Sequence, residues 1–411
     1  MRIECIAIGT ELLTTTRVDT NSVWLAQRLA DLGLAFHRKT AVGDHREDLR
    51  ALFREALDRS DLIVCTGGLG PTFDDFTKEV LAEIVGAPMI ENTEVMQDIL
   101  DFHARIQRPM PETNRKQALV PVGAEALRNP VGTAPGIWWE DPLGHPGKRV
   151  ALLPGVPREM KFLWEHEIEP RLRPLAGAPI HTLRMLVGSI GESALEMRTT
   201  PLREKHSSLD WTILASLGVV EFVARSADPA ALEAARVDFE AELGADRIST
   251  GGATLEETLL SMLAARFETL AIAESMTGGL IASRLTAIPG ASQSLMGASV
   301  VYSGQAKGLL ADVPASVLEA HGTVSEATSR ALAEGIRNKL DSTWGLGLTG
   351  NAGPTQDAQG QAPIGTCCLA IAGPKGTQSW ALNFTGERTT IQTRSATRAL
   401  DELRRTILAN P

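Results

Sequence analysis

Short apolar segments alternate with amphipathic segments along the first part of the chain. The apolar runs have the length of buried strands, and the longer segments between them carry apolar residues at helical spacing. In chain order, these segments lie at 3–8, 20–33, 35–42, 46–59 and 61–65. Strands that alternate with helices form a parallel sheet, which binds ligands at the carboxyl ends of its strands. The pattern therefore predicts an α/β domain with a parallel sheet over residues 1–170.

Proline residues mark a boundary after this domain. Pro170, Pro174 and Pro179 stand close together, and stretches rich in proline typically separate domains. Two strands and two helices alternate from 178 to 250, which predicts a small α+β domain. Helices and strands alternate again from 254 to 411, which predicts a second, C-terminal α/β domain. The predicted fold class is therefore multidomain α/β.

Charge and composition exclude several classes of protein. The 411 residues include 40 basic and 50 acidic residues, and the resulting net charge of −10 gives no overall field that attracts nucleic acid or an anionic membrane surface. The apolar runs are far shorter than the roughly 20 residues that span a membrane, and the N-terminus lacks the apolar core of a signal peptide. We therefore expect a cytoplasmic protein with neither nucleic acid nor a membrane as partner.

The cysteines lie in apolar, strand-like segments. No two of them form a C-x-x-C pair, so we expect buried, reduced thiols rather than a zinc site or a redox couple. The four residues are Cys5, Cys65, Cys367 and Cys368.

A glycine-rich loop follows the third predicted strand. It runs Thr66-Gly-Gly-Leu-Gly-Pro-Thr72, and we expect it at the same sheet edge as the loop after the first strand, which carries Gly9 and Glu11. Glycines let backbone N–H groups approach a phosphate closely, and a following helix directs its positive end at that anion. Asp74 and Asp75 come next and offer the oxygen ligands that Mg²⁺ takes beside phosphates. The loops therefore point to metal-assisted phosphoryl chemistry.

The glycine-rich loop also has a purely structural interpretation. It is then a tight turn between a strand and a helix, and Asp74 or Asp75 caps the helix that begins near Phe76. The spacing of the residues leaves both interpretations open.

Five ordered motifs give the N-terminal domain a family resemblance. They are Gly9-Thr-Glu-Leu-Leu13, Asp19-Thr-Asn21, Val42-Gly-Asp44, Thr66 to Thr72 with Asp74-Asp-Phe-Thr77, and Leu153-Pro-Gly-Val-Pro157. This set resembles the N-terminal domain of the competence/damage-inducible CinA family, which is similar in fold to molybdopterin-binding proteins. The resemblance implies a metal-dependent pyrophosphatase that cleaves ADP-ribose to AMP and ribose 5-phosphate. The middle segment resembles the KH-type domain of the same proteins.

The resemblance also implies roles for individual residues. Asp44, Asp74 and Asp75 would hold a divalent cation, Mg²⁺, Mn²⁺ or Co²⁺. The implied nucleotide-binding residues are Gly9, Glu11, Asn21, Gly67, Gly68, Gly70, Thr72 and Lys78. The chain departs from the family at Thr15, where a glycine usually stands. Because a β-branched residue tolerates positive φ poorly, we expect the loop to be reshaped there.

Three side chains of the C-terminal domain are expected to converge. Ser275 ends a predicted strand with a helix close behind it, and Tyr302 ends a second strand that is followed by Lys307. A serine hydroxyl is a poor nucleophile, and a lysine kept neutral by burial can take its proton, so no histidine is needed. The alternative is that Ser275 caps a helix, Tyr302 packs in the core and Lys307 is solvated.

The C-terminal domain shows five further motifs of the CinA family. They are Ala273-Glu-Ser-Met-Thr-Gly-Gly279, Tyr302-Ser303 with Ala306-Lys307, Gly322-Thr-Val-Ser-Glu326, Thr349-Gly350 with Ala352-Gly-Pro354, and Pro363 with Gly365-Thr366. The domain they resemble also occurs alone as a nicotinamide mononucleotide deamidase. The resemblance implies hydrolysis of the carboxamide to nicotinate mononucleotide and ammonia without a cofactor. The chain departs from the family at Gly304, at Asn351 and over 354–360.

The implied amidase mechanism assigns each residue a task. Ser275 would attack the amide, Lys307 would act as general base and then as acid, and Tyr302 would orient the proton transfer. The candidates for the oxyanion hole are the backbone N–H groups of Thr277, Gly278 and Gly279. The candidates for binding the 5′-phosphate are Thr349, Gly350, Ala352, Gly353 and Arg388, with Arg394 in reserve.

Alternatives remain for the N-terminal domain and for the assembly. The domain either cleaves ADP-ribose, or binds it as a regulatory module without cleavage, or belongs to a molybdopterin pathway. The last alternative leaves the C-terminal serine and lysine unexplained. We further expect a homodimer.

Overall fold

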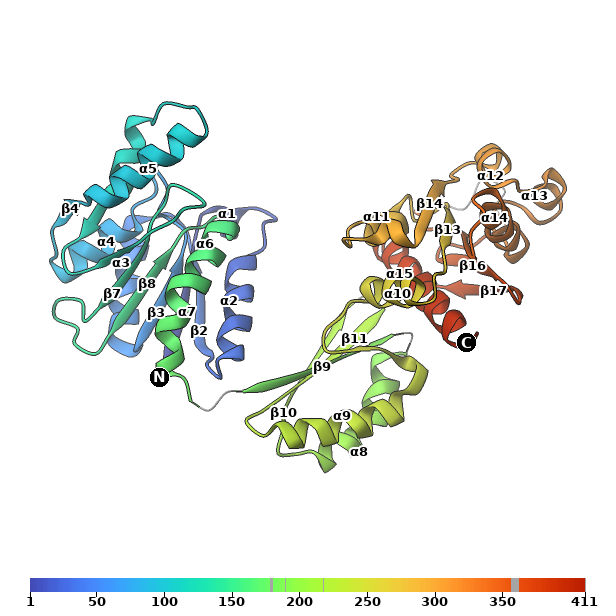
Figure 1. The fold of residues 1–411 in the computed structure, drawn as a ribbon, viewed down its shortest axis with the longest axis horizontal. Coiled ribbons are helices and arrows are strands. Elements are labelled where there is room, and N and C mark those ends of the chain that lie inside the picture. Colours follow the sequence, from blue (N-terminus) through green and yellow to red (C-terminus); the bar gives the residue numbers. More distant parts are fainter. Residues whose placement is uncertain (178–179, 189, 217, 356–361, 411) are drawn as a thin grey trace. The chain divides into compact units, whose positions relative to one another are not determined.

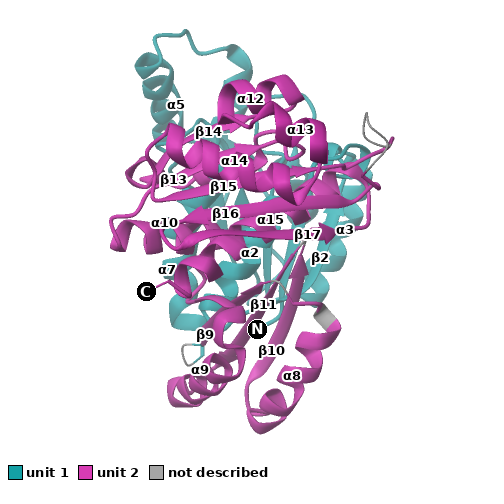
Figure 2. Cartoon of the chain, turned by 90° about the vertical axis from the view of Figure 1, so that its right-hand side faces the viewer, with its two compact units in different colours: residues 1–180 teal, residues 181–411 magenta. Residues whose placement is uncertain are grey.

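The computed structural model describes residues 1–411 except 178–179, 189, 217, 356–361 and 411. It comprises two compact units, residues 1–180 and residues 181–411 (Figure 2). Figure 1 labels the helices and strands of both units.

The N-terminal unit is built on a six-stranded sheet with the order β2-β1-β3-β8-β7-β6. The strands are β1 (Ile3–Ile8), β2 (Phe36–Val42), β3 (Leu62–Thr66), β6 (Glu125–Leu127), β7 (Gly136–Glu140) and β8 (Arg149–Leu153). The first four strands in that order are parallel, and β7 and β6 run antiparallel at one edge. The central strands β1 and β3 are buried along their whole length, as expected of strands covered on both faces.

Helices cover both faces of this sheet (Figure 1). They are α1 (Glu11–Thr14), α2 (Thr20–Asp31), α3 (Arg46–Arg59), α4 (Thr77–Val85), α5 (Thr93–Arg105), α6 (Pro157–Leu163) and α7 (Glu169–Leu172). Phe53 of α3 and Leu81 of α4 pack in the core on one face, whereas Leu29 of α2 and Met160 of α6 pack on the other. A small two-stranded sheet pairs β4 (Met89–Glu91) with β5 (Leu119–Pro121).

The middle segment begins the C-terminal unit with an antiparallel sheet of order β10-β11-β9-β12. Its elements are β9 (His181–Gly188), α8 (Glu192–Lys205), β10 (Asp210–Ser216), β11 (Val219–Ser226), α9 (Pro229–Leu243) and β12 (Arg247–Thr250). Phe239 of α9 packs against the sheet, stacking on Trp211 with ring centroids 4.9 Å apart. The predicted α+β composition is present, and the KH-type resemblance remains a prediction.

The rest of the C-terminal unit surrounds a five-stranded sheet of order β14-β13-β15-β16-β17. The strands are β13 (Leu270–Glu274), β14 (Leu295–Val300), β15 (Trp344–Gly350), β16 (Thr366–Gly373) and β17 (Gly376–Asn383). The helices are α10 (Leu255–Ala265), α11 (Leu280–Thr286), α12 (Gly304–Ala311), α13 (Ala315–His321), α14 (Glu326–Lys339) and α15 (Arg388–Leu408). β14, β13 and β15 are parallel, and β16 and β17 add antiparallel strands.

Glycine allows one close approach in this sheet. A Cβ atom on Gly345 of β15 would lie 2.1 Å from the carbonyl oxygen of Ala333 in α14, so the helix backbone rests directly on the strand. The chain also has 3₁₀ helices at Glu112–Ala118 (η1), Arg173–Leu175 (η3), Gly244–Asp246 (η4) and Ala291–Gln293 (η5), and a π-helix at Trp164–Ile168 (η2).

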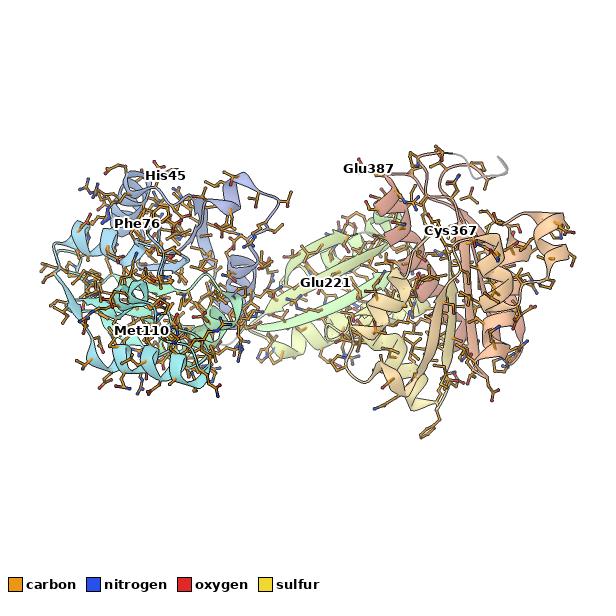
Figure 3. All side chains as sticks on the ribbon, turned by 90° about the horizontal axis from the view of Figure 1, so that it is seen from above. His45, Phe76, Met110, Glu221, Cys367 and Glu387 are labelled. Carbon is orange, nitrogen blue, oxygen red and sulfur yellow. The ribbon has the colours of Figure 1, made fainter. Side chains whose placement is uncertain are left out.

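The predicted multidomain α/β class is confirmed, with one difference. The sheets at both ends of the chain are mixed rather than wholly parallel. The four cysteines are free and buried as expected, and burial raises the pKa of Cys367, labelled in Figure 3, to about 12. No helix in the described ranges has the length and apolar character needed to cross a bilayer.

The expectation for Thr15 is wrong. Thr15 has φ −126° and ψ −178°, which is extended backbone that any residue adopts. Its hydroxyl donates a hydrogen bond to the carbonyl oxygen of Glu11 at 2.7 Å. The departure from glycine therefore imposes no backbone strain.

Candidate active sites

Ser275 is the first residue beyond strand β13. Its backbone N–H donates to the carbonyl oxygen of Leu348 at 3.0 Å, so the ladder between β13 and β15 holds the serine in place. Gly278 and Gly279 then adopt positive φ values of 64° and 97°, which turns the chain into α11. The Ser275 hydroxyl is therefore carried on a rigid strand end above a sharp turn.

Lys307 lies in α12 and points at this serine. Its Nζ donates to Ser275 Oγ at 3.0 Å and to the carbonyl oxygen of Val301 at 2.9 Å. The lysine is only 2% exposed, and this burial lowers the pKa of its ammonium group to about 8. With this pKa, about a tenth of the amine is neutral at pH 7 and about half at pH 8, and the neutral form can accept the serine proton.

The structural alternative for these three residues is wrong. The N-cap of α11 is Gly279, without a capping side chain, so Ser275 does not cap that helix. Lys307 is buried rather than solvated, and Tyr302 is 63% exposed rather than packed in the core. Tyr302 also lies two residues beyond β14, which ends at Val300 and not at the tyrosine as predicted.

The structure joins Tyr302 to Arg388. The Arg388 Nη2 group donates to the Tyr302 hydroxyl at 2.9 Å, and its Nη1 group donates to the carbonyl oxygen of Gly353 at 2.6 Å. The tyrosine hydroxyl thus accepts a hydrogen bond from the predicted phosphate ligand Arg388. The predicted role of Tyr302 in proton transfer between Ser275 and Lys307 stays a prediction.

A buried carboxylate organises the turn after Ser275. Glu274 is fully buried and accepts from Thr277 Oγ1 at 2.6 Å, from the N–H of Ile281 at 3.2 Å and from the N–H of Ala282 at 3.0 Å. The Gly278 N–H donates to the carbonyl oxygen of Ser275 at 3.0 Å and is already used in the turn. Of the predicted oxyanion donors, the N–H groups of Thr277 and Gly279 therefore stay the candidates.

The predicted phosphate loop is closed on itself by Asn351. The Asn351 amide accepts from the Gly353 N–H at 2.9 Å and donates to the carbonyl oxygen of Ala362 at 3.0 Å. Thr349 is buried and its hydroxyl donates to Thr323. Gly350 ends β15 and Ala352 packs in the core. Part of the 354–360 departure, residues 356–360, lies outside the described residues.

The glycine-rich loop of the N-terminal unit borders a cavity of about 540 Å³. Most of the predicted residues line it: Gly9, Glu11, Asp44, Gly67, Gly68, Gly70, Thr72, Asp74 and Asp75. Asn21 lines an adjoining cavity of about 240 Å³ that shares Glu11 with the first. Lys78 lines neither cavity, because its buried Nζ donates to the carbonyl oxygens of Lys116 and Gln117.

The glycines of this loop are required by close contacts. Gly67 has φ +109°, and a Cβ on it would lie 2.1 Å from the carbonyl oxygen of Ile8. A Cβ on Gly68 would lie 1.9 Å from Thr77 Oγ1. Any larger residue would therefore displace the loop from the ends of β1 and β3.

The aspartates of the loop do not cap the next helix. The N-cap of α4 is Phe76, which Figure 3 labels, and it has no capping side chain. Asp75 instead accepts from the Thr72 N–H at 2.9 Å, and the Thr72 hydroxyl bonds to both Asp74 and Asp75. The helix-cap interpretation is therefore wrong, and both carboxylates face the cavity.

The carboxylates that line the N-terminal cavity are suited to a divalent cation that is also bound by the substrate phosphates. Asp44, Asp74 and Asp75 line the same cavity, and carboxylate oxygens suit Mg²⁺ and similar hard cations. In the described part of the chain, no group of three or more acidic, histidine or cysteine residues is arranged to hold a metal by itself. Mg²⁺ is usually bound through one or two carboxylates together with substrate phosphates, so this donor set fits it.

Comparison with known proteins covers both sites. A family model described as "CinA C-terminal domain" matches residues 252–407, and one described as "Probable molybdopterin binding domain" matches residues 4–174. A CinA-like protein from Koribacter versatilis is 39% identical over 415 residues, which cover 99% of this chain and 100% of the relative. The chain belongs to the CinA family.

Other CinA proteins match in the same way. A CinA-like protein from a Synechococcus species is 38% identical and covers 99% of this chain and 98% of its own. The solved CinA protein from Thermoplasma acidophilum is 34% identical, covers 41% of this chain and 96% of its own, and has a TM-score of 0.37. This CinA family member thus carries a molybdopterin-binding-like domain at its N-terminus and the CinA C-terminal domain at its other end.

Three side chains of this CinA chain were missed by the sequence analysis. Glu159 lines the large N-terminal cavity and accepts from Asn129 Nδ2 at 2.5 Å, and burial raises the pKa of its carboxyl group. Arg17 lines both N-terminal cavities. Gln392 of α15 donates to the carbonyl oxygen of Met276 at 2.7 Å and so fixes the Ser275 turn. Glu159 lies two residues after the motif Leu153 to Pro157, and this position could have marked it as a candidate site residue.

Proposed function

We propose that this CinA family member hydrolyses pyridine nucleotides at two sites. The C-terminal site deamidates nicotinamide mononucleotide to nicotinate mononucleotide and ammonia. The N-terminal site cleaves ADP-ribose to AMP and ribose 5-phosphate. The observation that carries the first activity is the 3.0 Å contact between a buried lysine amine and Ser275 Oγ.

The proposed deamidation proceeds through an ester. Neutral Lys307 takes the Ser275 proton as Oγ attacks the carboxamide carbon, and the oxyanion is met by N–H groups of the Thr277 to Gly279 turn. The lysine ammonium then gives a proton to the leaving nitrogen, which departs as ammonia. Water, deprotonated by Lys307, attacks the ester and releases the carboxylate together with the serine hydroxyl.

The proposed N-terminal reaction uses the cavity beneath the glycine-rich loop. The loop would bind the phosphates through backbone N–H groups beyond Gly67, since the Gly67 N–H already donates to the carbonyl oxygen of Leu153. A divalent cation held by one or two of the carboxylates of Asp44, Asp74 and Asp75, together with the substrate phosphates, would neutralise the negative charge of the pyrophosphate. If the domain binds ADP-ribose without cleavage, the same residues would serve a regulatory module.

Two substitutions test the amidase directly. Ser275→Ala and Lys307→Ala should each lower kcat for ammonia release from nicotinamide mononucleotide by at least about 100-fold, because general-base catalysis alone contributes about 10²–10⁴-fold. Combining the two should cost little more, since the residues act as one unit. The readout is ammonia release by the full chain.

Matched controls accompany these variants. Ser283→Ala and Lys375→Ala alter an exposed serine and an exposed lysine and should leave kcat unchanged. Far-ultraviolet circular dichroism checks that all variants fold. Retention of more than about a tenth of wild-type kcat by either site variant would contradict the pair, given that expected loss.

A further inference from the structure

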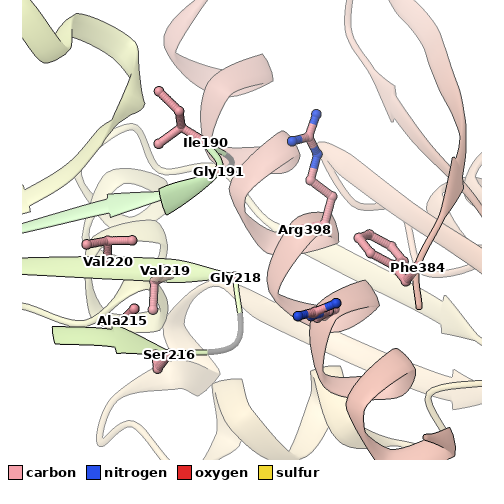
Figure 4. Close-up of a pocket in the computed structure, with 10 residues that line it drawn as sticks. Ile190, Gly191, Ala215, Ser216, Gly218, Val219, Val220, Phe384 and Arg398 are labelled. Atoms are coloured by element: carbon pink, nitrogen blue, oxygen red, sulfur yellow. The ribbon is translucent and has the colours of Figure 1, made fainter. Parts of the chain in front are cut away.

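A cavity of about 380 Å³ lies within the C-terminal unit, where the middle segment meets α15 (Figure 4). One wall comes from the ends of β10 and β11, including Ser216 and Val219. The other wall comes from α15 and from Phe384, which follows β17. Neither Ser275 nor Lys307 lines this cavity, so it is distinct from the amidase site.

Two arginines of α15 line this junction cavity. Arg394 and Arg398 lie one turn apart on α15, and among its described lining residues they are the charged ones. Arg398 pairs with Glu402 at 2.5 Å, and Arg394 Nη1 donates to the carbonyl oxygen of Thr385 at 3.1 Å. Like charges four residues apart on a helix repel each other, so an anion bound between the two guanidinium groups would stabilise this arrangement.

The volume and apolar residues of the junction cavity suit a ligand that has an apolar part as well as an anionic group. Phe384 offers an aromatic ring on the same side of the cavity as Arg398 (Figure 4), and Ile190 and Val219 add apolar surface. The volume falls within the range of about 300–1,000 Å³ typical of small-molecule sites. A phosphate group for the arginines and a planar base for the phenyl ring satisfy both parts of the lining.

A helix end adds a further site for negative charge. The 14-residue helix α8 begins directly after Gly191, which lines the cavity and provides no capping side chain. The first N–H groups of a helix lack internal partners and favour anions.

We propose that the junction cavity binds a 5′-mononucleotide, with its phosphate between Arg394 and Arg398 and its base against Phe384. The ligand class is a free mononucleotide rather than a nucleic acid, because the chain as a whole carries a net charge of −10. The site is independent of both proposed activities, so its test needs neither of them.

The test compares two nearly isosteric variants of the full chain. Ser216→Asp places a carboxylate beside the arginines, and Ser216→Asn is its neutral control of the same size. AMP is added stepwise, and the rate of amide hydrogen exchange is measured in the segment that contains Phe384, Arg394 and Arg398. The glycine-rich loop at 66–72 is followed in parallel, since AMP bound at the N-terminal cavity would protect that loop and not this segment.

The wild type and Ser216→Asn should show saturable protection of the α15 segment. In Ser216→Asp, the AMP concentration that gives half-maximal protection should rise at least about tenfold. A tenfold rise corresponds to the loss of one charge-assisted hydrogen bond. Adenosine, which lacks phosphate, should give no protection, and inorganic phosphate should protect only at higher concentration. Equal protection in Ser216→Asp, no protection by AMP in the wild type, or tighter binding of a four-nucleotide RNA than of AMP would overturn the proposal.

Discussion

Two buried lysines of this chain have similar pKa values but different hydrogen-bond partners. Lys78 and Lys307 are 3% and 2% exposed, and burial lowers the pKa of each to about 8. Lys78 donates to two backbone carbonyl oxygens, whereas Lys307 donates to one carbonyl oxygen and to Ser275 Oγ. Only the second arrangement places the amine against a group that can become a nucleophile. The partner, and not the pKa, separates a catalytic lysine from a structural one.

The lowered pKa of Lys307 predicts the pH profile of the amidase. The neutral amine is the base, and its pKa falls from 10.5 to about 8, so kcat/KM for nicotinamide mononucleotide should rise with pH and level off above about 8. Below that value, each pH unit should cost about tenfold. Lys307→Arg, which stays charged, should be inactive throughout. A profile that is flat between pH 6 and about 9 would contradict this role.

Arg388 is predicted to bind the 5′-phosphate of the mononucleotide. Its guanidinium group is exposed and held by Tyr302 and Gly353, and a planar fork pairs with phosphate in a way that a lysine cannot reproduce. Arg388→Lys should lower kcat/KM for the mononucleotide at least about tenfold, mainly through KM. Kinetics with nicotinamide riboside, which lacks the phosphate, provide the control and should change little. Equal losses for both substrates would make Arg388 structural or catalytic.

At the scale of elements, strands were predicted from the sequence where their apolar residues form an uninterrupted run. The buried runs of β1, β3 and β13 were recognised because nearly every position is apolar or small, with Glu4 and Glu274 as the charged exceptions. The edge strand β14 alternates between half-buried and exposed residues, and its predicted end at Tyr302 was two residues too late. β10 and β17 were not predicted, since exposed positions interrupt their apolar pattern.

Long-range contacts explain what the sequence missed at the sites. Glu159 reaches its cavity through Asn129, and Gln392 reaches Met276 across 116 positions of sequence. Neither pairing leaves a periodic signal, because each depends on how separate elements dock. Motif spacing did bring Ser275 and Lys307 together correctly, since each follows a neighbouring parallel strand.

Glu274 joins strand β13 to helix α11 and should act as a positioning residue. Glu274→Gln replaces an oxygen acceptor by an N–H₂ group that faces the donors from Thr277, Ile281 and Ala282. We expect kcat to fall about tenfold or more, with KM nearly unchanged. Glu319→Gln, at an exposed position of α13, should be silent.

The pH profile separates positioning from chemistry in this variant. Among the described residues, the Glu274 carboxylate bonds to the Ser275 turn and burial sets the pKa of Lys307, so the midpoint near pH 8 should persist in Glu274→Gln at lower amplitude. A shift of that midpoint by a full pH unit would show that the carboxylate acts on the lysine itself.

On the scale of the whole molecule, the candidate sites of the two units contain different functional groups. The N-terminal cavity is lined by several carboxylates and a glycine-rich loop, whereas the C-terminal site rests on a neutral amine and a hydroxyl. In the proposed reactions, the phosphates of ADP-ribose would need a cation in the first site, while amide hydrolysis by a serine and a lysine would need none in the second. The predicted homodimer would bring two copies of each site together.

This division predicts that a chelator separates the two activities. EDTA should abolish AMP production from ADP-ribose and leave ammonia release from nicotinamide mononucleotide intact, because only the N-terminal carboxylates depend on a divalent cation. Asp75→Asn should reproduce the effect of EDTA, while Ser275→Ala should remove ammonia release alone. Restoring AMP production with Mg²⁺, Mn²⁺ or Co²⁺ identifies the cation.

Binding measurements complete this test at the N-terminal site. Calorimetry with ADP-ribose, run beside the AMP assay, distinguishes cleavage from regulation, because a regulatory module would bind the nucleotide with Mg²⁺ present and release no AMP. Deamidation that collapses with EDTA and returns with added metal would contradict a mechanism built on Ser275 and Lys307 alone. Loss of both activities in Asp75→Asn would show that the two units depend on each other, since this carboxylate lies in the N-terminal cavity.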